Sequence, residues 1–308
     1  MTKIKNYLSL VKFSHTIFAM PFAIIGFVLG LIEHVKLPNH IYTNTSKINA
    51  SIISTLSHYH IITLALVLIC MITARSAAMA FNRYLDRSFD AKNPRTAIRE
   101  IPKGIISANS ALRFVIINCV VFIVATYFIN TICFYLSPVA LFVILFYSYT
   151  KRFTALCHLV LGIGLSLAPI GAYLAVTGSF ALLPILFSFA VMFWVSGFDI
   201  IFALQDVEFD QSQKLYSIPA VLGISKALRV SELLHIFSAS CVMAAGYLGS
   251  FGWLYWIGVV IFTAMLFYQH AIVKPNDLSK VNIAFMTANG IASVVFAVFV
   301  IADVLLLK

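Results

Sequence analysis

The chain of 308 residues is strongly apolar, with 61% hydrophobic and only 10% charged residues. Soluble domains carry about 25% charged residues, and the apolar excess here extends along nearly the whole chain, which excludes a soluble enzyme with one membrane anchor. The net charge of +10 does not indicate a nucleic-acid partner, because the 21 lysines and arginines fall mostly between apolar runs. We therefore expect a lipid bilayer, and no nucleic acid, around this protein.

Nine apolar runs follow one another along the chain, each near the length of about 20 residues that a membrane-spanning helix needs. They lack the alternation of apolar and polar residues that is typical of membrane β-barrels. The sequence predicts an all-α, polytopic membrane bundle of about nine transmembrane helices around a central cavity. The predicted helices cover residues 15–32, 60–82, 111–130, 132–149, 155–176, 181–204, 229–248, 252–273 and 283–305.

We expect a single transmembrane domain over residues 1–308. An acidic motif ends the second predicted helix and another ends the sixth, which predicts two four-helix halves followed by a ninth helix. With nine helices, the side of the N-terminus holds 17 lysines and arginines, against three on the other side. Cytoplasmic segments carry an excess of such residues, so we expect a multi-pass protein of the cell (inner) membrane with a cytoplasmic N-terminus.

The acidic residues are few and clustered. The chain has 11 of them, and seven fall in two short windows at predicted cytoplasmic helix ends. Carboxylates near a bilayer are costly and usually functional. The windows contain Asp86, Asp90 and Glu100, and then Asp199, Asp206, Glu208 and Asp210.

The spacing in the first window predicts one acidic helix face. Residues four apart differ by only about 40° around a helix, so Asn82, Asp86 and Asp90 point the same way. Arg75 precedes Asn82 by seven residues and should lie on this face, one to two turns deeper in the membrane. A guanidinium at that depth needs an anionic partner. Two partners fit equally: the carboxylate of a bound acid, or Asp86 or Asp199 in an ion pair.

The second window predicts a matching face. Asp206 and Asp210 are four residues apart, and Asp199 precedes Asp206 by seven. Carboxylates and substrate phosphate oxygens are the ligands that Mg²⁺ prefers. Any single aspartate here is compatible with the ordinary end of a membrane helix, but two acidic faces beside an intramembrane arginine favour a magnesium site.

Cationic side chains near these faces indicate phosphate binding. Arg95 follows the first window, and Lys151 and Arg152 lie between the fourth and fifth predicted helices, on the same side of the membrane. Guanidinium and ammonium groups bind phosphate oxygens through charge-assisted hydrogen bonds. Aromatic residues nearby are candidates for stabilising a carbocation through their π faces. They are Phe81, Tyr84, Tyr147, Phe198 and Phe202.

Three stretches resemble the signatures of the UbiA superfamily of membrane prenyltransferases. The first is Asn82-Arg83-Tyr84-Leu85-Asp86 with Asp90 and Asn93-Pro94-Arg95-Thr96. The second is Asp199-Ile200-Ile201-Phe202-Ala203-Leu204-Gln205-Asp206 with Asp210. The third, from Tyr147 to Lys151-Arg152, is similar to the basic motif of that superfamily. The resemblance covers essentially the whole chain, with one departure at Phe202, where the family often has tyrosine.

The resemblance implies a Mg²⁺-dependent aromatic prenyltransferase, similar to 4-hydroxybenzoate polyprenyltransferase. Such an enzyme transfers a polyprenyl group from an allylic polyprenyl diphosphate to an aromatic hydroxy acid in ubiquinone or menaquinone biosynthesis. Catalytic roles are then expected for Asp86, Asp90, Asp206 and Asp210. Mg²⁺ ligands are expected among Asn82, Asp86, Asp90, Asp199, Asp206 and Asp210, and substrate-binding residues among Arg75, Asn82, Arg95, Lys151, Arg152 and Asp199.

Two features resemble the branch of the superfamily that acts on 1,4-dihydroxy-6-naphthoate in the futalosine route to menaquinone. They are Ser14-His15-Thr16 leading to Pro21, and Gly197-Phe198-Asp199-Ile200-Ile201 together with Ser217-Ile218-Pro219. The sequence leaves open whether the acceptor is this compound or 4-hydroxybenzoate.

Other functions remain as alternatives. A haem or chlorophyll prenyltransferase of the same superfamily has similar motifs. A divalent-cation transporter would also use carboxylates, but transporter sites lie near the bilayer midplane at broken helices, whereas these motifs lie at helix ends. A structural assembly protein has no need of paired acidic faces.

Overall fold

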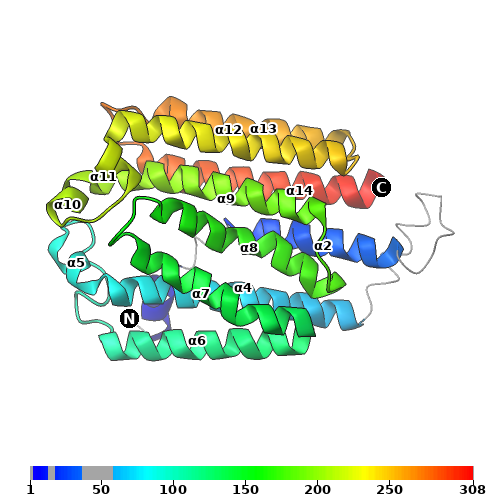
Figure 1. The fold of residues 1–308 in the computed structure, drawn as a ribbon, viewed down its shortest axis with the longest axis horizontal. Coiled ribbons are helices and arrows are strands. Elements are labelled where there is room, and N and C mark those ends of the chain that lie inside the picture. Colours follow the sequence, from blue (N-terminus) through cyan, green and yellow to red (C-terminus); the bar gives the residue numbers. More distant parts are fainter. Residues whose placement is uncertain (1–2, 13–17, 37–57, 308) are drawn as a thin grey trace.

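The computed structural model describes residues 3–12, 18–36 and 58–307, which form a bundle of roughly parallel helices (Figure 1). Eight helices within these ranges are long and apolar enough to cross a membrane. The predicted helix over 15–32 is α2, Met20–Lys36, whose apolar part, Met20–Glu33, is shorter than the other spans. The all-α polytopic bundle is therefore confirmed, with eight long spans and one shorter apolar helix. The Ser14-His15-Thr16 stretch lies outside the described residues.

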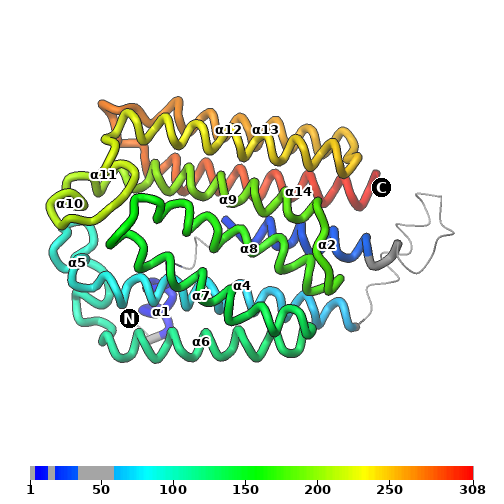
Figure 2. Tube along the Cα trace, viewed as in Figure 1, coloured from blue at the N-terminus to red at the C-terminus, as the bar shows by residue number. Residues whose placement is uncertain are grey.

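The long helices follow the predicted order, with ends that differ by a few residues. They are α4 His58–Leu85, α6 Ala108–Ile129, α7 Thr131–Thr150, α8 Cys157–Thr177, α9 Leu182–Ala203, α12 Ile224–Leu248, α13 Trp253–Ile272 and α14 Asn289–Leu307, the last preceded by a π-helical turn, Ile283–Ala288. Short helices are α1 Lys3–Leu10, α5 Arg87–Lys92, η2 Leu204–Asp206, α10 Val207–Ser212 and α11 Ile218–Leu222. Figure 2 traces α1 beside α4 and α6 at the end of the bundle that holds α5.

The centre of the packing is Trp194 of α9, which is fully buried. Its ring lies against Phe22 of α2 and Phe262 of α13, with ring centroids 5.4 and 5.9 Å away. The indole Nε1–H donates to Oδ1 of Asn289 over 2.8 Å. A buried tryptophan thus keeps its polar atom satisfied, and three helices distant in sequence are joined around it.

Both acidic windows interrupt their helices at an aspartate. α4 ends at Leu85, and Asp86 has φ −88° and ψ 5°; α9 ends at Ala203, and Asp206 has φ −110° and ψ 6°. This bridge region of backbone conformation is common among active-site residues. Each window is a helix end that leads into a short helix: α4 leads into α5 at Asp86, and α9 leads through the 3₁₀ turn η2 into α10. These short helices lie at the same end of the bundle, with α11 (Figure 1).

Glycine at position 26 permits the close contact of α2 with α8. A Cβ built there would lie 2.0 Å from the carbonyl oxygen of Pro169, whereas one at Gly171 would meet nothing within 4 Å. Small residues allow helix backbones to approach closely in membranes. The contact fixes α2 against the wall of the bundle.

Gly26→Ala should lower the thermal stability of the detergent-solubilised protein, because the backbone of Pro169 has no room to move away. Overpacking of this kind costs about 1–3 kcal/mol. Gly171→Ala in the same helix pair is the control and should leave the unfolding midpoint unchanged or raise it, since alanine favours helix over glycine. Equal midpoints for the two variants would contradict the assigned contact.

Candidate active site

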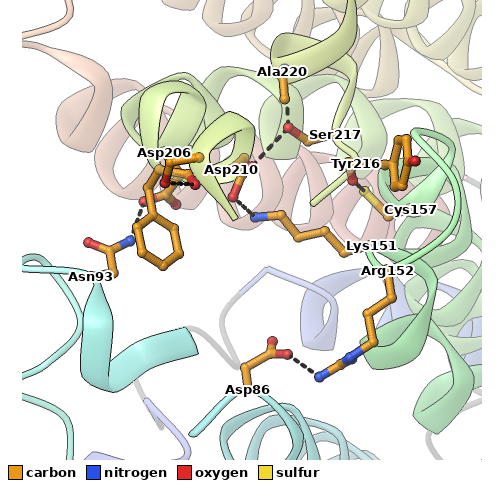
Figure 3. A network of polar contacts seen from close by, with 12 residues as sticks. Asp86, Asn93, Lys151, Arg152, Cys157, Asp206, Asp210, Tyr216, Ser217 and Ala220 are labelled. Atoms are coloured by element: carbon orange, nitrogen blue, oxygen red, sulfur yellow. Dashed lines mark hydrogen bonds and ion pairs between the residues drawn. The ribbon is translucent and has the colours of Figure 1, made fainter. Parts of the chain in front are cut away.

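The predicted polar residues meet at the end of the bundle occupied by α5, α10 and α11, where the two acidic windows face each other across the turn between α7 and α8 (Figure 3). That turn carries Lys151 and Arg152. Figure 3 shows Lys151 reaching toward Asp210 and Arg152 toward Asp86, so the basic motif lies between the two windows.

In the first window, Asp86 accepts hydrogen bonds from two predicted site residues. Asn82 Nδ2 donates to Oδ2 over 3.1 Å, and Arg152 Nη2 donates to Oδ1 over 2.9 Å. Arg152 Nη2 also donates to the carbonyl of Leu85, 3.1 Å away. The hydrogen bonds from the amides of Asp86 and Asp90 to the carbonyl groups four residues earlier continue through the break. Asn82 and Asp86 therefore remain neighbours although the helix ends between them.

Asp90 is buried and pairs with Arg99, whose Nη1 lies 2.6 Å from Oδ1. Arg99 was not predicted as a site residue. It lies among the turns between α5 and α6, where no helical spacing relates it to Asp90.

In the second window, Asp206 binds the segment after α5. Arg95 donates to both carboxylate oxygens, from Nε to Oδ1 over 3.0 Å and from Nη2 to Oδ2. Asn93 Nδ2 also donates to Oδ1, over 3.2 Å. This bidentate contact between guanidinium and carboxylate is a geometry that arginine is well suited to form. It ties the two windows directly to each other.

Asp210 has no exposed surface and contacts two donors. Lys151 Nζ lies 2.7 Å from Oδ1, and the Ser217 hydroxyl donates to Oδ2 over 2.9 Å. A buried carboxylate requires such partners, because its removal from water is otherwise expensive.

Asp199 pairs with a histidine, whereas the other two aspartates of its window pair with an arginine and a lysine. Its Oδ2 lies 2.7 Å from Nδ1 of His158, and Nε2 of His158 accepts from the amide of Ile218 over 3.3 Å. His158 was not predicted from the sequence, because it lies 41 residues from Asp199 and carries no motif of its own. Asp199 lies in α9, whereas Asp206 lies in η2 and Asp210 in α10.

The site is electrically balanced. Each of the four aspartates at positions 86, 90, 206 and 210 pairs with one arginine or lysine. Burial raises the pKa of Asp86 to about 6, although Arg152 lowers it. Burial lowers the pKa of Lys151, but the charge and hydrogen bond of Asp210 more than offset this, so that its pKa lies above the ordinary value. The balance matters because unpaired charges near a bilayer are unfavourable.

The carboxylates fit a magnesium ion in chemistry but do not form a closed cage. Across the described residues, no three histidine, cysteine, aspartate or glutamate side chains converge in a metal-binding group. Mg²⁺ is often held by only one or two carboxylates together with water and substrate phosphate. Oδ2 of Asp90 is buried with no hydrogen-bond partner, and an acceptor oxygen left open in this way is what a cation would use.

A cavity of about 370 Å³ begins next to these residues. Its walls come from α4, α6, α7 and α8, and it is almost wholly apolar. Met79 and Tyr147 line it, one helical turn before Arg83 and Lys151. The polar site therefore stands at one end of an apolar cavity inside the bundle.

Arg75 also lines this cavity, in keeping with its predicted depth. Its Nε is buried without a hydrogen-bond partner, and among the described residues it takes part in no ion pair with Asp86 or Asp199. Of the two predicted kinds of partner, the internal ion pair is not the arrangement of this structure.

Aromatic rings form the wall beside Asp206. Phe202 stacks near Phe285, with centroids 4.2 Å apart, and the guanidinium of Arg95 lies 5.3 Å from the centre of the Phe202 ring. Phe198 lies 5.5 Å from Phe285. Two of the aromatic candidates thus share one cluster with a ring from the π-helical turn, which the sequence did not indicate.

A family model for the UbiA prenyltransferase family matches residues 50–291. The chain belongs to the UbiA prenyltransferase family. The matched range holds both acidic windows and the basic turn.

Two relatives with assigned activities are similar to this chain at less than 30% identity. The 4-hydroxybenzoate octaprenyltransferase of Tolumonas auensis is 28% identical over 228 residues, which cover 74% of this chain and 79% of the relative. The enzyme of the same name from Nitrosospira multiformis is 29% identical over 223 residues, covering 72% and 77%. The chain is therefore a UbiA-family prenyltransferase similar to these enzymes over most of its length.

Solved structures agree on the fold. A UbiA homologue from Aeropyrum pernix K1 in its apo form is 27% identical, with a TM-score of 0.77 over 94% of this chain and 98% of that protein. A homologue from Archaeoglobus fulgidus bound to GPP and Mg²⁺ is 19% identical, with a TM-score of 0.68 over 97% and 99%. The UbiA-like arrangement of helices thus extends over nearly the whole chain.

The pairing of Lys151 with Asp210 predicts an unequal effect of charge removal. Lys151→Met should destabilise the ligand-free protein by about 3 kcal/mol, because it leaves a buried carboxylate without its cation. The double variant Lys151→Met/Asp210→Asn should recover most of that loss, as both charges are then absent. Chemical unfolding in detergent micelles measures both; a double variant no more stable than Lys151→Met would show that the two groups are not coupled.

Proposed function

We propose that this UbiA-family enzyme transfers a polyprenyl group from an allylic polyprenyl diphosphate to an aromatic hydroxy acid, with Mg²⁺ at the acidic windows. The observation that carries the proposal is the set of four carboxylate–cation pairs at one end of an apolar cavity. This arrangement matches a substrate with a charged head and a hydrocarbon tail. The diphosphate would lie at the pairs and the tail in the cavity or the adjoining lipid.

The charged residues divide into two groups in this proposal. Asn82, Asp86 and Asp90 would hold one Mg²⁺, and Asp206 and Asp210, with Asp199, would hold another. When bound, Mg²⁺ supplies positive charge that neutralises the departing diphosphate. Arg95, Lys151 and Arg152 would leave their aspartates and bind diphosphate oxygens, and Arg99 beside Asp90 is added to this group.

The reaction breaks the bond between the allylic carbon and the diphosphate oxygen. The electron pair leaves with the diphosphate, and the cationic side chains stabilise the charge that develops there. The remaining allylic cation must be kept from water, which would convert it to an alcohol. The apolar cavity wall and the rings of Phe198 and Phe202 support both exclusion of water and π stabilisation. The electron-rich ring of the acceptor then forms the new C–C bond and loses a proton.

Arg75 is the proposed partner of the acceptor carboxylate. Arg75 lines the cavity, and its Nε has no hydrogen-bond partner among the described residues. A buried guanidinium forms strong paired hydrogen bonds with a carboxylate. The ring of an aromatic acid held there would lie inside the apolar cavity, on the route from the diphosphate site.

The acceptor is proposed to be 4-hydroxybenzoate or 1,4-dihydroxy-6-naphthoate, which places the enzyme in ubiquinone or menaquinone biosynthesis. The names of the relatives favour the first compound, and the Gly197–Ile201 and Ser217–Pro219 stretches favour the second. The orientation follows from the 17 basic residues on one side, which favours a cytoplasmic N-terminus and a site on the cytoplasmic face of the cell membrane.

The decisive experiment is prenyl transfer by the purified protein with Mg²⁺, a radiolabelled polyprenyl diphosphate, and each acceptor in turn. Product should form with one acceptor and disappear when EDTA removes the metal. Asp86→Asn and Asp206→Asn should lower kcat by about 100-fold or more, because each removes a carboxylate that would hold the Mg²⁺ whose positive charge stabilises the departing diphosphate. Asp277→Asn, an exposed aspartate outside the site, is the control and should retain full activity.

Other outcomes identify the alternatives. Product with a haem or chlorophyll precursor and with neither acid would place the enzyme in another branch of the family. Uptake of Mg²⁺ into proteoliposomes in the absence of any lipid substrate, and no transfer to any acceptor, would overturn the enzymatic proposal in favour of transport.

Arg75→Lys separates the carboxylate role from a structural one. Lysine keeps the charge but cannot form the bidentate contact with a carboxylate. KM for the acceptor should therefore rise about tenfold or more, in line with the roughly 1.5–3 kcal/mol of a hydrogen bond to a charged group. KM for the diphosphate should stay the same. An unchanged KM for the acceptor with an altered dependence on Mg²⁺ would show that Arg75 serves the charged windows instead.

A further inference from the structure

We propose that His158 and the segment Tyr216–Ile218 form a brace that positions the aspartates of the second window, with His158 and Ser217 as positioning residues. The proposal rests on the proposed function, since it assigns the brace to the metal-binding carboxylates Asp199 and Asp210. Among the described residues, neither His158 nor Ser217 belongs to the lining of the cavity, and the side chain of each contacts an aspartate.

The hydroxyl of Ser217 has a fixed direction. Its oxygen accepts a hydrogen bond from the amide of Ala220 over 3.2 Å, at the start of α11. Its proton is therefore free to be donated, and the acceptor is Oδ2 of Asp210, 2.9 Å away. Both side chains are without exposed surface. One oxygen of Asp210 is thus held by the serine, and the other is presented toward Lys151 and the site.

The imidazole of His158 is fixed in the same manner. Nε2 accepts from the amide of Ile218, so in the neutral ring the proton must be on Nδ1, which faces Oδ2 of Asp199. The tautomer is therefore set by a backbone group, as in histidines whose second nitrogen is held by a neighbour. His158 is 3% exposed. Asp199 is consequently oriented by the Nδ1–H of an imidazole, whereas the other four aspartates are paired with arginine or lysine.

Backbone hydrogen bonds hold the segment around Ser217 in place. The amide of Tyr216 donates to the carbonyl of Lys151 over 2.7 Å, and the amide of Leu215 donates to the carbonyl of Asp210 over 2.8 Å. The thiol of Cys157 reaches the carbonyl of Tyr216, 3.6 Å away (Figure 3). Three successive residues, Tyr216, Ser217 and Ile218, therefore connect α10 with the basic turn and with the first residues of α8.

These contacts help to fix the relative position of the carboxylates of Asp199 and Asp210. Between Asp199 and Asp210 the chain passes from α9 through the 3₁₀ turn η2 into α10, so ideal α-helical geometry does not by itself fix the relation of the two carboxylates. Residues that hold a metal ligand through a hydrogen bond affect metal binding strongly, and their loss typically costs 10–100-fold in affinity or activity. The brace restores a fixed relation between the two carboxylates by contacts to one short segment.

The test measures binding of Mn²⁺ in the presence of pyrophosphate, by electron paramagnetic resonance on the full-length protein in detergent. Ser217→Ala and His158→Ala should each raise the Kd for Mn²⁺ about tenfold. His158→Asn places an N–H donor where Nδ1 lies and should bind within about threefold of the wild type. Ser238→Ala is the matched control, because Ser238 is equally buried and donates over 2.8 Å to a backbone carbonyl of another helix.

The outcomes separate the brace from the function on which it rests. If the wild type binds Mn²⁺ and pyrophosphate while Ser217→Ala and His158→Ala bind equally tightly, the brace is wrong and the proposed function stands. A loss in Ser238→Ala as large as in Ser217→Ala also overturns the brace, since any buried serine would then matter. A wild type that binds neither ligand overturns the proposed function itself. Unfolding midpoints accompany each measurement; if Ser217→Ala does not fold, the comparison of His158→Asn with His158→Ala decides.

Discussion

The structure depends on the pairing of charges at one end of an apolar bundle. Carboxylates and guanidinium groups are costly near lipid unless each has a partner of opposite charge. Here the partners come from different parts of the chain: Arg95 reaches Asp206, 111 residues away, and Arg152 reaches Asp86, 66 residues away. These contacts hold the two acidic windows and the basic turn together. The ends of α4, α7 and α9 are therefore fixed relative to one another by electrostatics as well as by packing.

The pairing also links the short helices that follow α4 and α9. α5 follows α4 at Asp86, and α10 follows α9 through η2, and both short helices lie at the same end of the bundle. The segments after α5 and around η2 then meet through Arg95, Asn93 and Asp206. A departure from ideal geometry at a functional site is expected where local and global requirements differ.

Much of this was accessible from the sequence, and the limits are physical. The lengths of the apolar runs predicted the helices because a bilayer sets the length of its spans. The rarity of acidic residues predicted where the polar site lies, because a carboxylate in an otherwise apolar chain is costly. Spacing predicted the neighbours Asn82 and Asp86, which hydrogen-bond. The spacing of seven between Asp199 and Asp206 spans the change from α9 to the 3₁₀ turn η2, and the contact that Asp199 makes is with His158.

Partners that are distant in sequence were beyond prediction from spacing. His158 has no motif, and its contact with Asp199 depends on how α8 packs against α9. Ser217 did carry a local signal, since a serine two residues before a proline is typical of a helix start. That signal predicts the hydrogen bond with the amide of Ala220 but not the one with Asp210, which depends on the turn from α10 into α11. The local sequence therefore determines the cap formed by Ser217, whereas the fold determines its contact with Asp210.

The balance of charges also constrains how ligands enter the proposed site. Lys151 and Arg152 contact the carboxylates that a metal ion would use, and the same two cations are the ones that a diphosphate would use. A metal ion alone would displace the cations and leave them without partners, and a diphosphate alone would leave the carboxylates without theirs. Only when both ligands arrive does every charge regain a partner of opposite sign. In the proposed reaction, exchange of these ion pairs for metal and diphosphate contacts would couple the two binding events through charge.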